Sequence, residues 1–210
     1  GAIITWGEDA HAVVAYSGGP LTTTINNAGT IGAHGDEADA IRAGGPAVRI
    51  RNNVVPADEE IEDSVDAVGV IFSGDGAAIR VEEAGDARIY NAGYIYGHVT
   101  VEAADYGYLS NDGLIESSRR WKPTVSIDVD EGDAVVVNSG DIFASGRDAE
   151  AVKLEGDSVS LTNSGTIAAS GKRGHAVDLE AEGVYGEVTL TNSGLIDASG
   201  EHADAIRAEG

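Results

Sequence analysis

Four side chains that could perform acid–base chemistry lie close together in the middle of the sequence. They are Asp105, Asp112, Glu116 and Arg119. Enzymes that cleave polysaccharides use a pair of carboxylic acids, one of which has a raised pKa. Polysaccharide enzymes built on parallel β-helices are usually longer chains with elaborate loops. We therefore expect that this chain is not an enzyme, with a polysaccharide lyase or hydrolase as the alternative.

A second group of carboxylates suggests a cation site. Asp128, Asp130, Glu131 and Asp133 surround Gly132, and Ca²⁺ binds carboxylate oxygens. Their order matches neither an EF-hand loop nor the glycine-rich nonapeptide of calcium-binding solenoids. The five histidines, His98 among them, have no spacing typical of Zn²⁺ and are expected on the surface. The sequence requires no cofactor, and Ca²⁺ is the one ion that it suggests.

A third group could bind a ligand or a partner through aromatic and basic side chains. Its members are Tyr94, Tyr96, Tyr106, Tyr108, Arg119, Arg120 and Trp121. Exposed aromatic side chains are typical of sugar-binding and protein-binding surfaces. The basic cluster could instead dock against an acidic surface of a neighbour. Aromatic stacking between strands and a solvated loop are the alternatives without a function.

The composition limits the class of partner. The formal net charge is −23, from 13 Lys and Arg against 36 Asp and Glu, which disfavours binding to nucleic acid or to anionic lipid. There is no Cys and therefore no disulfide. No apolar run is long enough to span a membrane, so we expect no membrane insertion. Apolar residues make up 42% of the chain, too many for a disordered acidic tail.

A repeat must position all of these side chains. The pattern Asn-x-Gly-x-Ile recurs, with an aliphatic residue two places before each Asn. The asparagines are Asn27, Asn52, Asn91, Asn111, Asn138, Asn163 and Asn192, and the copy at Asn52 is degraded, with Val54 and Pro56 in the Gly and Ile places. The Asn shares the parity of the buried aliphatic residue, so it should face inward. Stacked Asn side chains can then form a hydrogen-bonded ladder.

A second column of aliphatic residues, such as Ile41 and Ile206, follows about ten residues after most motif isoleucines. Each repeat thus contains three short strands, and no segment has a convincing helical period. Such strands can wind around a thin core and pair with their copies in the next coil. The sequence predicts an all-β, right-handed parallel β-helix of about eight coils, forming one domain over residues 1–210.

The repeat is interrupted in two places, where functional loops are usually found. An inserted arm is expected at about residues 56–78, and it contains an acidic run and a strand-like piece, 68–72. Irregular coils are expected at about residues 94–126. There Ile95 is only four residues before Val99, so one corner of the coil must be tightened.

Segments such as LTNSGTIAASG (161–171) and LTNSGLIDASG (190–200) alternate with DAIRA and AVDLE lines. Over nearly the whole chain this alternation resembles the β-helical passenger regions of Gram-negative autotransporters and large surface adhesins. The resemblance is specific for architecture and weak for activity, and no Gly-x-Ser-x-Gly segment of the proteases in that group is present. It implies an extracellular, cell-surface location.

The chain begins and ends within a repeat, which predicts bare strand edges at both ends. Head-to-tail pairing would use Ile3 and Val13 at one end and Ile196 and Ile206 at the other. We therefore expect an extracellular structural or adhesive solenoid, forming a filament or part of a longer surface protein. The alternative is a carbohydrate-binding or carbohydrate-processing β-helix. An ice-binding solenoid is a third option, but no persistent Thr-x-Thr column supports it.

Overall fold

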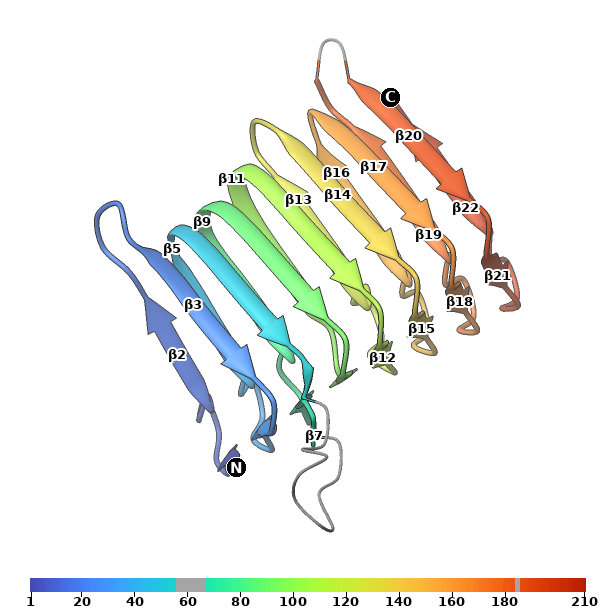
Figure 1. Ribbon diagram of the computed structural model, residues 1–210. Helices are drawn as coiled ribbons and strands as arrows, with labels where there is room; N and C mark the ends of the chain where they lie inside the picture. The colour runs from blue at the N-terminus through green and yellow to red at the C-terminus, as the bar shows by residue number, and fades with distance from the viewer. Residues whose placement is uncertain (56–66, 184–185) are drawn as a thin grey trace.

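The computed structural model describes residues 1–55, 67–183 and 186–210. Within these ranges all the regular elements are β-strands, and nearly all of them pair in parallel. The strands stack side by side along one direction, with the two chain ends at opposite ends of the stack (Figure 1). The prediction of an all-β fold with parallel sheets is confirmed. This arrangement is compatible with a β-solenoid.

The first sheet has eight strands, and each contains one residue of the isoleucine column. They are β1 (Ala2–Thr5), β4 (Thr30–Ala33), β8 (Val70–Ser73), β10 (Tyr94–Tyr96), β12 (Leu114–Ser117), β15 (Asp141–Ala144), β18 (Thr166–Ala169) and β21 (Leu195–Ala198). Neighbours pair in register, so that Ile95 lies between Ile71 and Ile115. These side chains are fully buried in the middle of the stack, which gives the sheet its apolar inner face.

The second sheet has two halves. Its leading half is formed by β2 (Val13–Tyr16), β5 (Ile41–Asn52), β9 (Ile79–Asn91), β11 (Val99–Asn111), β13 (Val125–Val129), β16 (Val152–Gly156), β19 (Val177–Ala181) and β22 (Ile206–Glu209). Its asparagine half is formed by β3 (Thr22–Asn27), the ends of β5, β9 and β11, β14 (Asp133–Asn138), β17 (Ser158–Asn163) and β20 (Glu187–Asn192). In β5, β9 and β11 the two halves are therefore one continuous strand.

These continuous strands differ from the three short strands expected in every repeat. The pairing between β5 and β9 shifts at Gly44 and Gly45, and the pairing between β9 and β11 shifts between Val101 and Tyr106. Such irregularities bend a strand without ending it. One strand can therefore follow two faces of the stack where later repeats use two strands joined by a turn.

The insertion lies before β8 (Val70–Ser73), so the arm expected at residues 56–78 was extended too far toward the C-terminus. Val70–Ser73 is the regular strand β8, and Ile71 pairs with Ile31 and Ile95. Gly69 and Ile71, not Val54 and Pro56, therefore take the Gly and Ile places of the motif that begins at Asn52. Before them, β6 (Val54–Val55) pairs with β7 (Ala67–Val68) in antiparallel fashion. The acidic run at 58–63 lies outside the described residues.

The seven asparagines form one hydrogen-bonded column along the inner side of the asparagine half. The side-chain amide nitrogens of the first six donate to the side-chain oxygen of the next Asn, over distances from 2.7 to 2.9 Å. The same nitrogens also donate to backbone carbonyls of the following turn, as Asn52 does to Gly69 at 3.0 Å. The ladder fixes the corner between the two sheets. Among the described residues, no helix has the length and apolar character needed to cross a membrane.

Candidate functional site

An unusually short turn between β10 and β11 lies at a concave site on the surface of the molecule. Only Gly97 and His98 join these strands, whereas residues 34–40 join β4 to β5 and residues 118–124 join β12 to β13. Gly97 has a φ of 124°, in the region that glycine adopts most easily. The tightened corner expected between Ile95 and Val99 is this turn. The neighbouring turn between β8 and β9, residues 74–78, is also shorter than the turns at 34–40 and 118–124, and a gap lies between these two longer turns.

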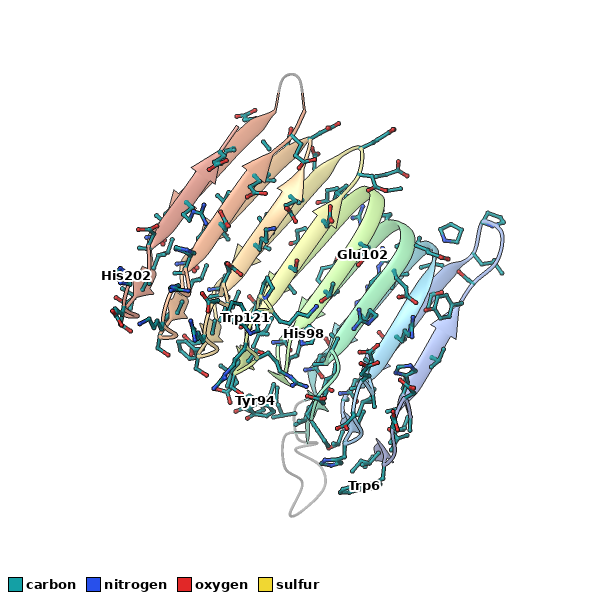
Figure 2. All side chains as sticks on the ribbon, turned by 180° about the vertical axis from the view of Figure 1, so that it is seen from behind. Trp6, Tyr94, His98, Glu102, Trp121 and His202 are labelled. Carbon is teal, nitrogen blue, oxygen red and sulfur yellow. The ribbon has the colours of Figure 1, made fainter. Side chains whose placement is uncertain are left out.

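The gap is a cavity of about 750 Å³, which we call the notch. Its lining comes from turns and strands of five repeats: Asp9, His11, Glu37, Asp39, Arg42, Gly74, Asp75, Gly76, Arg80, His98, Ser118, Arg119, Arg120 and Lys122. His98 and Trp121 lie on the same side of the molecule, near the middle of the stack (Figure 2). The notch thus brings together residues that are far apart in the sequence.

His98 lies at the short turn and is only 5% exposed, so the expectation that it is a surface histidine is wrong. Its backbone carbonyl accepts a hydrogen bond from the Ala78 N–H at 2.9 Å, which holds the turn against the neighbouring repeat. Its Nδ1 is buried and has no hydrogen-bond partner among the described residues. Burial, followed by the charges of Arg80 and Lys122, lowers the pKa of His98 to about 4. The ring is therefore neutral at pH 7.

Carboxylates hold three of the notch arginines in place. Arg42 donates to Glu82 from Nε at 2.7 Å and from Nη2 at 3.1 Å. Arg80 Nε lies 2.8 Å from Asp39 Oδ2, and Asp39 also accepts a hydrogen bond from the Ala77 N–H at 2.7 Å. Arg119 pairs with Asp75. A guanidinium held by one carboxylate still has further N–H groups that can be donated to a ligand. One of these, Nη2 of Arg119, is buried without a partner among the described residues.

Two further cations of the notch are not neutralised. Within the described ranges, neither Arg120 nor Lys122 is within ion-pair distance of a carboxylate. Charges in a concave, partly buried site interact more strongly with a ligand than charges on a flat surface. The notch lining therefore has five basic side chains against four carboxylates, a small local excess of positive charge on a strongly acidic molecule.

A second cavity of about 470 Å³ adjoins the notch and shares Gly74, Ser118 and Arg119 with it. The rings of Tyr96 and Phe143 contribute to its lining. Tyr96 is 38% exposed and stacks on Tyr94, with ring centroids 6.1 Å apart. A cationic cavity thus continues into an aromatic one.

The tyrosines that the sequence suggested as a ligand surface lie on two different sheets. Tyr94 and Tyr96 are on β10 of the first sheet, whereas Tyr106 and Tyr108 are on the asparagine half of β11. The second pair is also stacked, at 6.3 Å, and Arg88 lies 4.9 Å from the Tyr106 ring. Of these four tyrosines, Tyr96 is the one that lines the cavity adjoining the notch.

Trp121 is 63% exposed beside the notch and is held in place by its backbone. Its N–H donates to the Arg147 carbonyl at 3.1 Å, and it has a positive φ of 64°. The Arg147 guanidinium lies 5.6 Å from the indole ring. Arg119, Arg120 and Trp121 are thus part of one turn, of which the two arginines line the notch.

The carboxylates considered for catalysis are separated by the fold. Asp112 lies in the turn after the Asn motif, where the Ser139 hydroxyl donates to it, while Asp105 lies in the middle of β11. Glu116 and Arg119 line the cavity that adjoins the notch. The four residues suggested by sequence therefore do not share one cavity.

The acidic residues suggested for Ca²⁺ lie on the leading half and the turn that follows it. Asp128 is on β13, Asp130 and Glu131 are in the turn, and Asp133 begins β14. Among the described residues, no three His, Asp or Glu side chains form a group that could hold a metal ion.

Asp128 belongs instead to an outward-facing column of carboxylates. Glu102, Asp128, Glu155 and Glu180 are register neighbours on successive strands. Burial, followed by the charges of Glu155, Asp130 and Glu102, raises the pKa of Asp128. The pKa of Glu180 is also raised, first by its hydrogen bond with Glu155. We call this set the acidic column.

The residues suggested for end-to-end assembly lie on the terminal strands. Ile3 and Val13 are on β1 and β2, and Ile196 and Ile206 are on β21 and β22. Each of these strands has a neighbour on one side only. Ile3 is 50% and Ile206 45% exposed, so the apolar columns continue to both ends of the stack.

Sequence reasoning missed Arg42, Arg80 and Lys122 as site residues and assigned His98 to the surface. The available signal was the interval between Ile95 and Val99, because a shortened turn in a stack exposes the turns on either side. The comparisons of this chain with models of protein families, with curated proteins and with solved structures found no match.

Proposed function

We propose that the chain is a structural or adhesive segment of an extracellular, cell-surface protein. In this proposal it winds as a right-handed β-solenoid of eight coils, because connections between parallel strands are almost always right-handed. At about 4.8 Å per coil the rod is about 40 Å long. Its role is stiffness, reach and repeated contact, as in the autotransporter passengers that its sequence resembles, and it needs no catalytic group.

The observation that carries this proposal is the uninterrupted stack, because parallel pairing and the asparagine ladder continue through the described repeats. At each end, a parallel strand of both sheets presents unpaired N–H and C=O groups together with exposed column residues such as Ile3 and Ile206. Uncovered edges of this kind pair readily with further strands. The partners would be flanking coils or a second copy of the chain.

The strand order distinguishes these two partners. A second copy placed on the C-terminal end could pair its β1 with β21 and its β2 with β22. The asparagine half, however, ends at β20 and starts again at β3, so one strand position between them would stay empty. Head-to-tail stacking of two copies of this sequence would therefore leave one strand position of the asparagine half unpaired.

A tandem protein tests the proposal. Two copies of the chain are joined by a linker with the sequence of residues 157–164. This linker is chosen because Gly210 has the position of Gly156 in its repeat and Gly1 has the position of Gly165, so that residues 157–164 are the segment missing between them. Negative-stain electron microscopy should show straight rods of about 80 Å. A matched tandem with a Gly/Ser linker of the same length should show two shorter rods joined at an angle. Identical images and identical unfolding of the two tandems would count against a continuous solenoid.

The same microscopy tests self-association of the single chain. Regular thin fibres, with or without Ca²⁺, would support head-to-tail assembly despite the empty strand position. Short isolated rods would favour flanking coils as the natural continuation. Calcium binding at the acidic residues around Gly132 remains a separate proposal, and a calorimetric titration without heat and without a thermal shift would refute it.

A second candidate function, carbohydrate binding, is favoured by one observation. Tyr96, whose ring stacks on that of Tyr94, lines the cavity that adjoins the notch. Aromatic rings provide flat apolar surfaces against which sugar rings can pack. A glycan would then cross the rod at its middle, leaving both ends free for the structural role.

A further inference from the structure

The notch holds a larger share of the chain's basic residues than of its acidic ones. Five of the 13 Lys and Arg residues line it, together with four of the 36 Asp and Glu residues, namely Asp9, Glu37, Asp39 and Asp75. Arg42, Arg80 and Arg119 are oriented by carboxylates, while Arg120 and Lys122 have no such partner within the described ranges. Oriented donors next to unpaired cations are the features of a site that binds an anionic group.

Buried polar atoms without partners provide an independent sign of a ligand. The His98 side chain is more than nine-tenths buried, and its Nδ1 has no partner within the described ranges. The atom Nη2 of Arg119 is also buried and also has no hydrogen-bond partner within the described ranges. A buried polar atom without a hydrogen bond destabilises the folded state, so most buried polar atoms in native proteins have a partner. Both residues line the notch, so a polar ligand could satisfy these atoms after a side-chain movement that uncovers them.

The adjoining cavity indicates that the ligand extends beyond one anionic group. It continues from the notch through Gly74, Ser118 and Arg119 to the rings of Tyr96 and Phe143. An exposed tyrosine ring next to hydrogen-bonding groups suits a ring-shaped ligand that has both an apolar face and hydroxyl groups. A pyranose sugar has both features.

We propose that the notch binds the carboxylate of a uronic acid within an otherwise neutral glycan. In this arrangement Lys122 and Arg119 contact the carboxylate, His98 hydrogen-bonds a sugar oxygen, and the neighbouring sugar packs on Tyr96. The binding rests on the carbohydrate-binding candidate and does not depend on pairing of the rod's ends. No covalent step is involved.

The acidic column explains why the glycan should carry few charges. Glu102, Asp128 and Glu155 present successive carboxylates on the leading half of the second sheet, and the net charge of the molecule repels dense polyanions. A ligand with a single carboxylate can enter the cationic notch while its neutral parts lie over the surrounding surface. A sulfated or phosphorylated polymer could not avoid this repulsion along its length.

Isothermal titration calorimetry with a synthetic trisaccharide tests the proposal. The probe has one glucuronic acid between two neutral hexoses, and its control ligand has the same carboxyl group reduced to a hydroxymethyl. The variant Lys122→Gln removes one notch cation, and Lys172→Gln makes the same change in the exposed pair with Glu201, outside the notch. Tyr96→Ala tests the aromatic contact, and circular dichroism verifies that each variant is folded.

The acidic trisaccharide should bind the parent chain, and the reduced one should bind at least tenfold more weakly. Lys122→Gln should weaken binding about tenfold, the effect expected for one charge-assisted hydrogen bond, while Lys172→Gln should leave it unchanged. Tyr96→Ala should also weaken binding. In addition, ring ¹⁵N signals of histidine, assigned with His98→Gln, should show that the ligand perturbs His98 selectively.

Several results would overturn the proposal. Equal binding of the two trisaccharides would leave the carbohydrate candidate standing but would remove the carboxylate as the recognised group. Stronger binding of a Glu-rich peptide or of inorganic phosphate, each tested as a competitor, would assign the notch to another class of ligand. Absence of all glycan binding would refute both the inference and the carbohydrate candidate, and would not affect the test of the rod with tandem proteins.

Discussion

Replacing Asn111 by Ala should interrupt the asparagine ladder in the middle of the rod. The Asn111 side chain is fully buried. Its amide nitrogen donates to Asn138 Oδ1 at 2.8 Å and to the Gly113 and Asp141 carbonyls at 3.2 Å, and its oxygen accepts from Asn91 at 2.7 Å. The substitution removes all four hydrogen bonds and leaves a small void.

The expected loss of stability follows from the atoms left without partners. Asn138 Oδ1 loses its only hydrogen-bond donor within the described ranges. The Asn91 amide keeps only weaker contacts with the Gly93 and Leu114 carbonyls, at 3.2 and 3.3 Å. Each buried unsatisfied polar atom costs about 1–3 kcal/mol. We expect Asn111→Ala to lower the free energy of unfolding by about 2–4 kcal/mol.

Asn192 offers a matched control at the exposed end of the same ladder. It accepts from Asn163 at 2.8 Å, but water can replace it there, so Asn192→Ala should cost less than about 1 kcal/mol. Urea unfolding followed by far-UV circular dichroism measures both values, and an unchanged slope shows that the same structure unfolds. Losses within about 0.5 kcal/mol of each other would refute the view that buried amide pairing stabilises the stack.

Three further predictions concern packing and charge. Gly140→Ala should destabilise the fold by more than about 2 kcal/mol in the same assay, because its Cβ would lie 2.1 Å from the Gly113 backbone oxygen. Gly18→Ala, with open space around the Cβ, should be neutral. When the pH falls from 7 to 5, the free energy of unfolding of the parent chain should decrease by about 2 kcal/mol more than that of His98→Gln. The reason is that the pKa of His98 in the folded state, about 4, lies below the usual 6.5, so folding opposes protonation of His98. Equal decreases in the two proteins would contradict this. Asp128→Asn should raise the thermal midpoint at pH 7, corresponding to a gain of up to about 1 kcal/mol in the free energy of unfolding. The gain should vanish near pH 4, because the raised pKa of Asp128 means that folding disfavours the ionised carboxylate. A lower thermal midpoint of the variant at pH 7 would contradict the repulsion between the carboxylates.

Because the sequence repeats, the strands and the core residues of the scaffold could be predicted from it. The parity of Asn163 with Leu161 and the spacing to Ile167 are local patterns, and local patterns decide which side of a strand faces the core. All three side chains are buried in the structure. The copy at Asn52 was misassigned because the insertion separates the Asn from Gly69 and Ile71. Pairing with the neighbouring strands, which is not encoded locally, identifies these two residues as members of the motif.

The notch was not readable from sequence for a related reason. Arg42, Arg80 and Lys122 belong to separate repeats, and they approach one another only because the repeats stack in register. Sequence parity placed Tyr96 and Tyr106 outward, but it could not tell which face of the stack each would occupy. Burial of His98 follows from the shortness of its turn, which draws the side chain inward between two longer turns.

A shortened turn creates a site on a repetitive scaffold without changing the pairing of its strands. Removing residues between β10 and β11 leaves the ladders intact, since Ile95 and Val99 keep their register with the strands on both sides. The turns on either side are then exposed and supply the walls, and the buried turn supplies the floor. The position of the site is therefore fixed by the stack itself, and lengthening the turn after Ile95 to match its neighbours should fill the notch while preserving the rod.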